Sequence, residues 1–135
     1  MTAKNDLKRY KAIYYEVKFL RREIEGMYNT LKAVNYDEKT GTASGDDLTL
    51  IVVTQILKKK EYYEARVKEL WAEEERLLKR VDKIDNADIK RILLLRYIGF
   101  MPWAKIARET NYSESRIMQL HREGLTLLDQ QEKER

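Results

Sequence analysis

The sequence predicts an all-α protein, and three observations support this. The 135 residues include one proline and five glycines, so few positions interrupt a helix. Two long segments carry apolar residues at alternating steps of three and four, which is the spacing of one helix face. Residues 85–135 repeat this period in shorter stretches separated by turn residues.

The first long helix is expected over residues 3–35. At about 1.5 Å per residue it would be a rod about 50 Å long. Its apolar residues form a heptad seam, typical of a helix that packs along its whole length on another. The seam consists of Tyr10, Ile13, Val17, Leu20, Ile24, Met27, Leu31 and Val34.

A loop at 35–47 separates this helix from a second one over 47–84, and Asp46 or Asp47 can cap the second helix. The stretch "LTLIVVT" at its start is apolar on every side. We interpret it as a helical turn buried from several sides, as at an oligomer contact, with a strand as the alternative. The second seam is interrupted by Lys60 and Glu74 and consists of Val53, Ile56, Tyr63, Val67, Leu70, Leu77, Val81 and Ile84.

The two helices predict a long antiparallel, coiled-coil-like hairpin over residues 1–84. Two such helices leave apolar surface in water, and a second copy of the chain would cover it. We therefore expect a homodimer; the alternative is a monomer whose seams pack on each other and on the C-terminal domain. The residues expected to dimerise are Val17, Leu20, Ile24, Ile56, Tyr63 and Leu70.

Residues 85–135 predict a second domain of three helices. The first helix covers 85–100, with Asp85 or Asn86 as its cap and Gly99 in the left-handed conformation that ends it. Pro102 suits the first turn of the next helix, because its missing N–H costs nothing there. Trp103, Ile106 and the small Ala107 form the inner face of that helix.

A sharp turn joins the last two helices. Thr110 ends the middle helix, Asn111 tolerates the positive φ that a sharp turn often needs, and Ser113 caps the last helix. Ile117, Leu120, Leu125 and Leu128 turn inward in the last helix. This is the layout of a helix-turn-helix, whose last helix presents its N-terminal end outward and fits a major groove about 12 Å wide.

The charge of this region favours a polyanionic partner. Residues 86–122 hold seven basic and three acidic residues, and this excess equals the whole formal net charge of +4. The partner that we expect is double-stranded DNA.

The stretch "DIKRILLLRYIGFMPWAKIARETNYSESRIMQLHREGLTLLD" (88–129) resembles the C-terminal helix-turn-helix of bacterial sigma factors, in "LLLRY", "IA" and "SESRIMQLHREGLTLL". The whole layout resembles small phage-encoded transcriptional regulators of the ArpU type, which have "TWEEIA…NYS" where this chain has "PWAKIARETNYS". The resemblance implies that Glu114, Ser115, Met118 and Gln119 face the groove. Sigma domains often carry Arg at the positions of Glu114 and Met118, so this chain is expected to read a different DNA sequence.

The chemistry of these side chains fits base reading. Gln119 can pair with adenine, Glu114 can accept from cytosine N4, and Met118 can pack on a thymine methyl group. The basic side chains suit phosphates, which set affinity rather than sequence preference. These backbone-contacting residues are Lys105, Arg108, Arg116 and Arg122. We expect His121 to lie on the surface beside the groove.

Other functions find little support. The chain has no cysteine and one histidine, and Asp46 and Asp47 are too few to bind a metal unaided. "GTASGDD" lacks the Lys-Ser/Thr ending of a phosphate-binding loop. We expect no metal, no cofactor and no catalytic residue, and therefore no enzyme. "KKK" (58–60) and "EEE" (73–75) are interpreted as solvated helix faces.

The chain starts without the apolar stretch of a signal peptide, and its apolar runs at 48–57 and 92–101 are too short and polar to cross a bilayer. We expect a cytoplasmic protein with no membrane contact. The function expected is sequence-specific transcriptional regulation, of phage or mobile-element late genes. The alternatives are a protein-interaction module that contacts RNA polymerase or a phage protein, and a small terminase-like DNA-packaging subunit that forms a ring.

Overall fold

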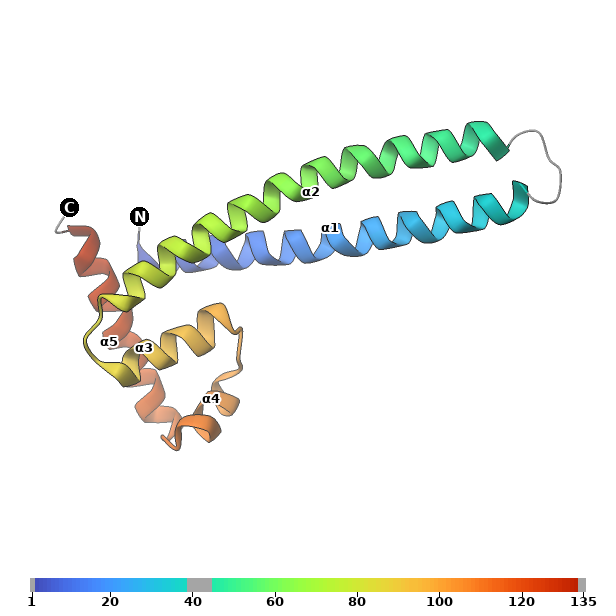
Figure 1. The fold of residues 1–135 in the computed structure, drawn as a ribbon. Coiled ribbons are helices and arrows are strands. Elements are labelled where there is room, and N and C mark those ends of the chain that lie inside the picture. The colour runs from blue at the N-terminus through green and yellow to red at the C-terminus, as the bar shows by residue number, and fades with distance from the viewer. Residues whose placement is uncertain (1, 39–44, 134–135) are drawn as a thin grey trace. The chain divides into compact units, whose positions relative to one another are not determined.

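The computed structural model describes residues 2–38 and 45–133, and every regular element within them is helical. The absence of any strand from these ranges confirms the all-α class. None of the helices described combines the length and the apolar character that crossing a bilayer needs. In chain order the elements are α1 (Ala3–Glu38), α2 (Gly45–Asp82), α3 (Ala87–Leu93), the π-helical turn η1 (Leu94–Ile98), α4 (Trp103–Thr110) and α5 (Glu114–Lys133) (Figure 1).

The first two helices depart from their expected ends. α1 continues to Glu38, and α2 begins at Gly45, so Asp47 lies in its first turn rather than at a cap. The rest of the expected loop, 39–44, lies outside the described residues. The stretch 48–54 is helical, not a strand, and in the single chain Leu50 is 66 % exposed.

The chain forms two compact units. We call Ala12–Leu70 the hairpin unit, and Met1–Lys11 together with Trp71–Arg135 the head unit. The expected division was 1–84 and 85–135. The N-terminal end of α1 and the C-terminal end of α2 therefore belong to the same compact unit as the C-terminal helices.

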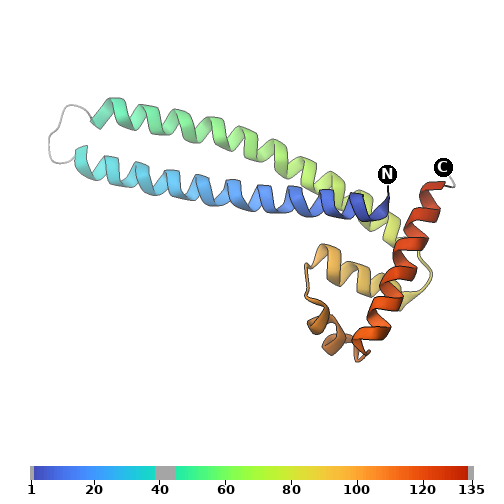
Figure 2. The same cartoon turned by 180° about the vertical axis from the view of Figure 1, so that it is seen from behind.

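Within the hairpin unit, α1 and α2 run side by side in opposite directions (Figures 1 and 2). Leu20, Ile24, Ile56 and Leu70 are buried here in a single copy of the chain, and Val17 and Tyr63 are half-buried. The six residues expected to join two copies therefore lie in the seam of one chain. The physical reason is that two antiparallel apolar seams of one chain cover each other without a partner.

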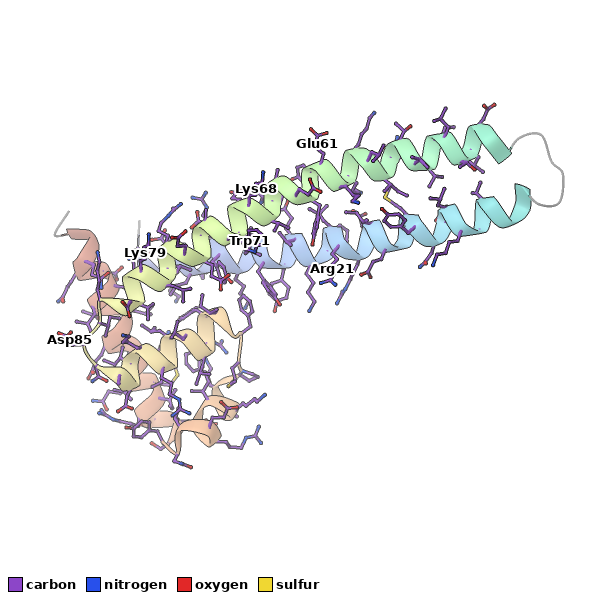
Figure 3. The ribbon with its side chains drawn as sticks, in the orientation of Figure 1. Arg21, Glu61, Lys68, Trp71, Lys79 and Asp85 are labelled. Carbon is purple, nitrogen blue, oxygen red and sulfur yellow. The ribbon has the colours of Figure 1, made fainter. Side chains whose placement is uncertain are left out.

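Ion pairs flank this seam. Lys59 Nζ lies 2.7 Å from Glu23 Oε2, and the Arg66 guanidinium binds the carboxylate of Glu16. Lys59 is half-buried, whereas Lys60 is exposed, so the expectation that Lys60 occupies the seam was wrong by one position. Exposed side chains of this unit include Arg21 on α1 and Glu61 on α2 (Figure 3).

The head unit has its own core, to which both ends of the chain contribute. The backbone N–H of Ala3, which is fully buried, donates to Asp129 Oδ1 on α5 across 2.7 Å. Arg80 on α2 is buried, and its guanidinium bonds Asp6 (2.8 Å) and the carbonyl oxygen of Leu128 (3.1 Å). The core consists of Ala3, Val81, Ile84, Ile89, Ile92, Leu93, Ile106, Ile117, Leu120 and Leu128.

One acidic side chain in this unit contradicts a sequence expectation. Glu73 was expected on a solvated face, but it is buried, 5 % exposed. Its carboxylate lies 3.5 Å from Arg9 and 3.3 Å from Arg76. These two guanidinium groups compensate the buried charge, which would otherwise be costly. Glu74, expected in the seam, is half-buried.

Candidate nucleic-acid interface

The helix that supports the candidate interface starts as the sequence predicts. Asn86 caps α3, because its Oδ1 accepts from the backbone N–H of Asp88 (2.9 Å) and of Ile89 (3.1 Å). Asp88 lies in the first turn, where a negative charge is favourable. Ile89 is buried, so the cap fixes which face of α3 points into the core.

The end of this helix differs from expectation. The chain passes through the π-helical turn η1, and the residue with positive φ is Phe100 (52°) rather than Gly99 (−85°). A Cβ on Gly99 would lie 2.8 Å from the carbonyl oxygen of Leu95, so glycine serves a close approach here. The ring of Phe100 stacks on that of Tyr10, with centroids 6.0 Å apart. This packing holds Phe100 in a conformation that aromatic residues rarely adopt.

α4 begins one residue later than expected. Pro102 occupies the N-cap position, with φ −61° and ψ 148°, and its carbonyl accepts from Lys105 (3.0 Å) and Ile106 (3.1 Å). Ile106 is fully buried, and Trp103 and Ala107 pack against the core from half-buried positions. The inner face of α4 is therefore the one that its apolar spacing predicts.

The turn from α4 to α5 confirms the predicted roles of its residues. α4 ends at Thr110, and Asn111 adopts the left-handed conformation with φ 61° and ψ 20°. Ser113 Oγ accepts from the backbone N–H of Arg116 across 3.1 Å, which caps α5. The hydroxyl of Tyr112 donates to the Asp88 carboxylate (2.7 Å), so the turn is tied to the start of α3.

α5 divides into a buried and an exposed face. Ile117, Leu120 and Leu128 are buried, as predicted, and Leu125 is half-buried. Gly124 lies so close to α3 that a Cβ there would stand 2.9 Å from Ile89 Cγ2. Ala107 was the small residue singled out from the sequence, and the close approach at Gly124 was missed.

The residues proposed to contact DNA are accessible in the free protein. Glu114, Ser115 and Gln119 are exposed on the first turns of α5, and Met118 is half-buried beside them. Two of these turns are linked, because Arg116 Nη1 donates to Gln119 Oε1 across 2.8 Å. The four residues expected at phosphates are all exposed: Lys105, Arg108, Arg116 and Arg122.

His121 contradicts the expectation that it lies on the surface. It is half-buried, its Nε2 is hydrogen-bonded to the Tyr97 hydroxyl, and its ring meets the Trp103 ring edge-on with centroids 4.7 Å apart. The Arg96 guanidinium lies 4.2 Å from the centroid of the Trp103 ring. This cluster joins η1, α4 and α5, and the aromatic residues in all three segments were a signal that sequence reasoning did not use.

Burial lowers the pKa of His121, and the positive charges of Arg96, Lys4 and Arg122 lower it further. Nδ1 of His121 is buried without a hydrogen-bond partner in the described part of the chain. A neutral imidazole suits such a site better than a charged one. His121 therefore has a packing role behind the exposed face of α5.

The candidate site of the head unit therefore consists of a short helix, a turn with a left-handed residue, and a longer helix whose first turns expose polar and basic groups. The chain belongs to the family described as "Protein of unknown function (DUF1492)", whose family model matches residues 37–129. That range takes in α2, α3, α4 and most of α5. No curated protein matches the chain, and no solved structure matches it.

Proposed function

We propose that this protein is a sequence-specific, double-stranded DNA-binding regulator of transcription that acts in the cytoplasm as a dimer. One observation carries the proposal: the turn at Asn111 and Ser113 ends α4 and starts α5 with the first turns of α5 open to solvent. A helix placed in this way can enter a major groove while the helix before it crosses the DNA backbone.

The exposed groups supply both kinds of contact that specific binding needs. Gln119 pairs with adenine N6 and N7, Glu114 accepts from cytosine N4, and Met118 contacts a thymine methyl group. The exposed side chains of Lys105, Arg108, Arg116 and Arg122 bind phosphates. Phosphate contacts dominate affinity, and base contacts give preference for one site over others.

The resemblance to ArpU-type regulators and to the sigma-factor helix-turn-helix supports the same proposal. It points to phage or mobile-element late genes as the regulated genes. We propose no catalysis and no cofactor, because the protein acts by binding DNA.

A gel-shift titration on the DNA upstream of the protein's own gene tests this function. The expected result is binding that weakens steeply between about 50 and 200 mM salt, as counterion release requires. Nuclease protection on the same fragment is expected to show one discrete footprint. A protein with no footprint and no preference over scrambled DNA of the same composition would contradict sequence-specific binding.

The second candidate is a protein-interaction module that contacts RNA polymerase or a phage protein. The observation that favours it is Glu114, an exposed acidic side chain in the first turn of α5, which phosphates would repel. Pull-down of purified RNA polymerase in the absence of DNA supports this candidate if Glu114→Ala abolishes it. Under the DNA-binding proposal the same substitution alters base preference instead.

A further inference from the structure

The first turns of α2 in the hairpin unit expose an unusual amount of apolar surface. Leu50 is 66 % exposed and Leu57 62 %, and these two residues stand two helical turns, about 10 Å, apart on one face. Ile51 is 57 % exposed beside them. The opposite face of the same helix already packs in the seam, where Ile56 is buried. Contiguous exposed apolar side chains of this kind mark an interaction surface.

The apolar residues of this face lie symmetrically about its midpoint, and the two ends of the face carry opposite charges. Asp47 stands one turn before Leu50, and Lys60 stands one turn after Leu57, with Thr54 near the midpoint. The order is therefore acidic, apolar, β-branched, apolar, basic. Asp47, Thr54 and Lys60 are exposed in the single chain. The Lys60 ammonium group lies 3.5 Å from the Tyr28 hydroxyl. This hydroxyl is neutral, so it does not balance the positive charge of Lys60.

Such an order is complementary to itself when two copies of the helix run antiparallel. A two-fold axis near Thr54 places Leu50 of each copy against Leu57 of the other. The same axis places Asp47 against Lys60 at both ends, so both ends carry opposite charges. A parallel pair would instead bring Asp47 against Asp47 and Lys60 against Lys60, and like charges in contact disfavour that arrangement.

We propose that a second copy of this chain binds here, through an isologous antiparallel contact of the two α2 helices. We call this surface the α2 patch; it consists of Asp47, Leu50, Thr54, Leu57 and Lys60, and it ends just before Glu61, which Figure 3 labels. The contact is closed, because each copy uses its patch once, so it makes a dimer and no larger assembly. This inference deepens the dimer in the proposed function and replaces the buried seam as its interface.

The mass of the full chain in solution, measured by light scattering without DNA, is the first test. Wild type is expected to be a dimer, and Leu57→Ser is expected to raise the dimer dissociation constant at least about tenfold. Phe19→Ser is the matched control, because Phe19 is 59 % exposed on α1 outside the α2 patch, and it is expected to leave the dimer intact. A wild-type monomer, or a ring of many copies, would overturn the proposal.

Charge exchange tests the pairing itself. Asp47→Lys and Lys60→Asp are each expected to weaken the dimer at least about tenfold, because each brings like charges together. The double variant restores opposite charges in exchanged places and is expected to recover most of the loss. Circular dichroism confirms that each variant is folded. Additive losses in a folded double variant would contradict the antiparallel contact.

The absence of cysteine from the chain permits a direct test of direction. Under mild oxidation, a mixture of Leu50→Cys and Leu57→Cys chains is expected to form the mixed disulfide. Neither variant alone is expected to cross-link, because each position stands about 10 Å along the helix from its own counterpart. Cross-linking of each variant with itself would show parallel pairing and overturn the proposal. DNA binding by a monomeric protein would leave the proposed regulatory function standing and remove only this interface.

Discussion

The guanidinium of Arg116 donates a hydrogen bond to the side-chain oxygen of Gln119, 2.8 Å away and one turn further along α5. Both side chains are exposed. A carbonyl oxygen has two lone pairs, so Oε1 can accept from Arg116 and from adenine N6 together. In the proposed complex Arg116 would therefore contact phosphate and also orient the residue that reads the base.

This link gives a specific outcome for substitutions in α5. Gln119→Ala is expected to cost about 1–3 kcal/mol of binding free energy at one base pair and to relax preference there. In a chain that already carries Arg116→Ala, the same change is expected to cost less, because Gln119 has lost its orienting bond. Fluorescence anisotropy with a DNA site and its single-base variants measures the binding free energy of the wild type, of each single variant and of the double variant.

Two controls accompany these measurements on Gln119 and Arg116 variants. Gln130→Ala changes the same residue type at an exposed position later in α5 and is expected to leave affinity and preference unchanged. Arg116→Ala alone is expected to reduce the slope of log affinity against log salt by about one. Equal losses on every sequence from Gln119→Ala would argue against a base contact.

The turn before α5 depends on the left-handed conformation of Asn111. Asn111→Val is expected to lower the free energy of unfolding by about 1–3 kcal/mol, because a β-branched residue is strained there. Asn111→Gly, which adopts this conformation freely, is expected to change it by a few tenths of a kcal/mol only. Urea denaturation measures both. Similar losses from the two variants would show that a side-chain contact, and not backbone conformation, matters at this position.

Two glycines in helices are expected to respond to alanine with opposite signs. A Cβ on Gly124 would stand 2.9 Å from Ile89 Cγ2 and 3.0 Å from Leu93 Cδ1, both in the core, so Gly124→Ala is expected to destabilise by about 1–3 kcal/mol. Gly26 has nothing within 4 Å, and Gly26→Ala is expected to stabilise by about 1 kcal/mol. Thermal denaturation of both variants decides the matter. Stabilisation by Gly124→Ala would mean that α5 and α3 pack less closely.

Stability is expected to depend on the protonation of His121. Its pKa in the folded chain lies below the ordinary value because of burial and the nearby charges of Arg96, Lys4 and Arg122. At a pH between the folded and the unfolded pKa of His121, unfolding therefore leads this imidazole to take up a proton. The contribution of this group is complete above its ordinary pKa of about 6.5 and is lost as the pH falls through the lower, folded value.

The measurement is the urea midpoint at about pH 7.5 and pH 5.5, a range above most carboxylate titrations. The urea midpoint of the wild type is expected to be lower at about pH 5.5 than at about pH 7.5, and the midpoint of His121→Gln is expected to decrease less between these pH values. The comparison uses the change with pH in each protein, so an overall destabilisation of the variant does not affect it. An identical fall in both would assign the pH dependence to other groups.

Local chemistry was the part of the structure that the sequence revealed best. Asn86, Asn111 and Ser113 occupy the cap and turn positions predicted for them, because each acts on backbone groups within three residues. The all-α class follows in the same way from apolar period and from the scarcity of glycine and proline. These signals need no knowledge of distant contacts.

Distant contacts explain the errors. The backbone N–H of Ala3 bonds Asp129, and the ring of Phe100, the residue with positive φ, stacks on Tyr10. In both contacts the two residues are far apart in the sequence. The seam residues pair within one chain, and apolar spacing alone does not distinguish that from pairing between two copies. Exposure of Glu114 and Gln119 keeps base reading possible, while their role in it stays a prediction.

A tethered cleavage probe tests our claim that the first turns of α5 enter the DNA groove. Because the chain lacks cysteine, Ser115→Cys or Gln130→Cys can carry a single iron chelate that generates hydroxyl radicals. With the probe at position 115, strand cleavage is predicted inside the footprint on the protein's own upstream DNA. The probe at position 130 is predicted to cut there far less. Cleavage of equal strength from both positions, or from neither while the protein is bound, would contradict the claim.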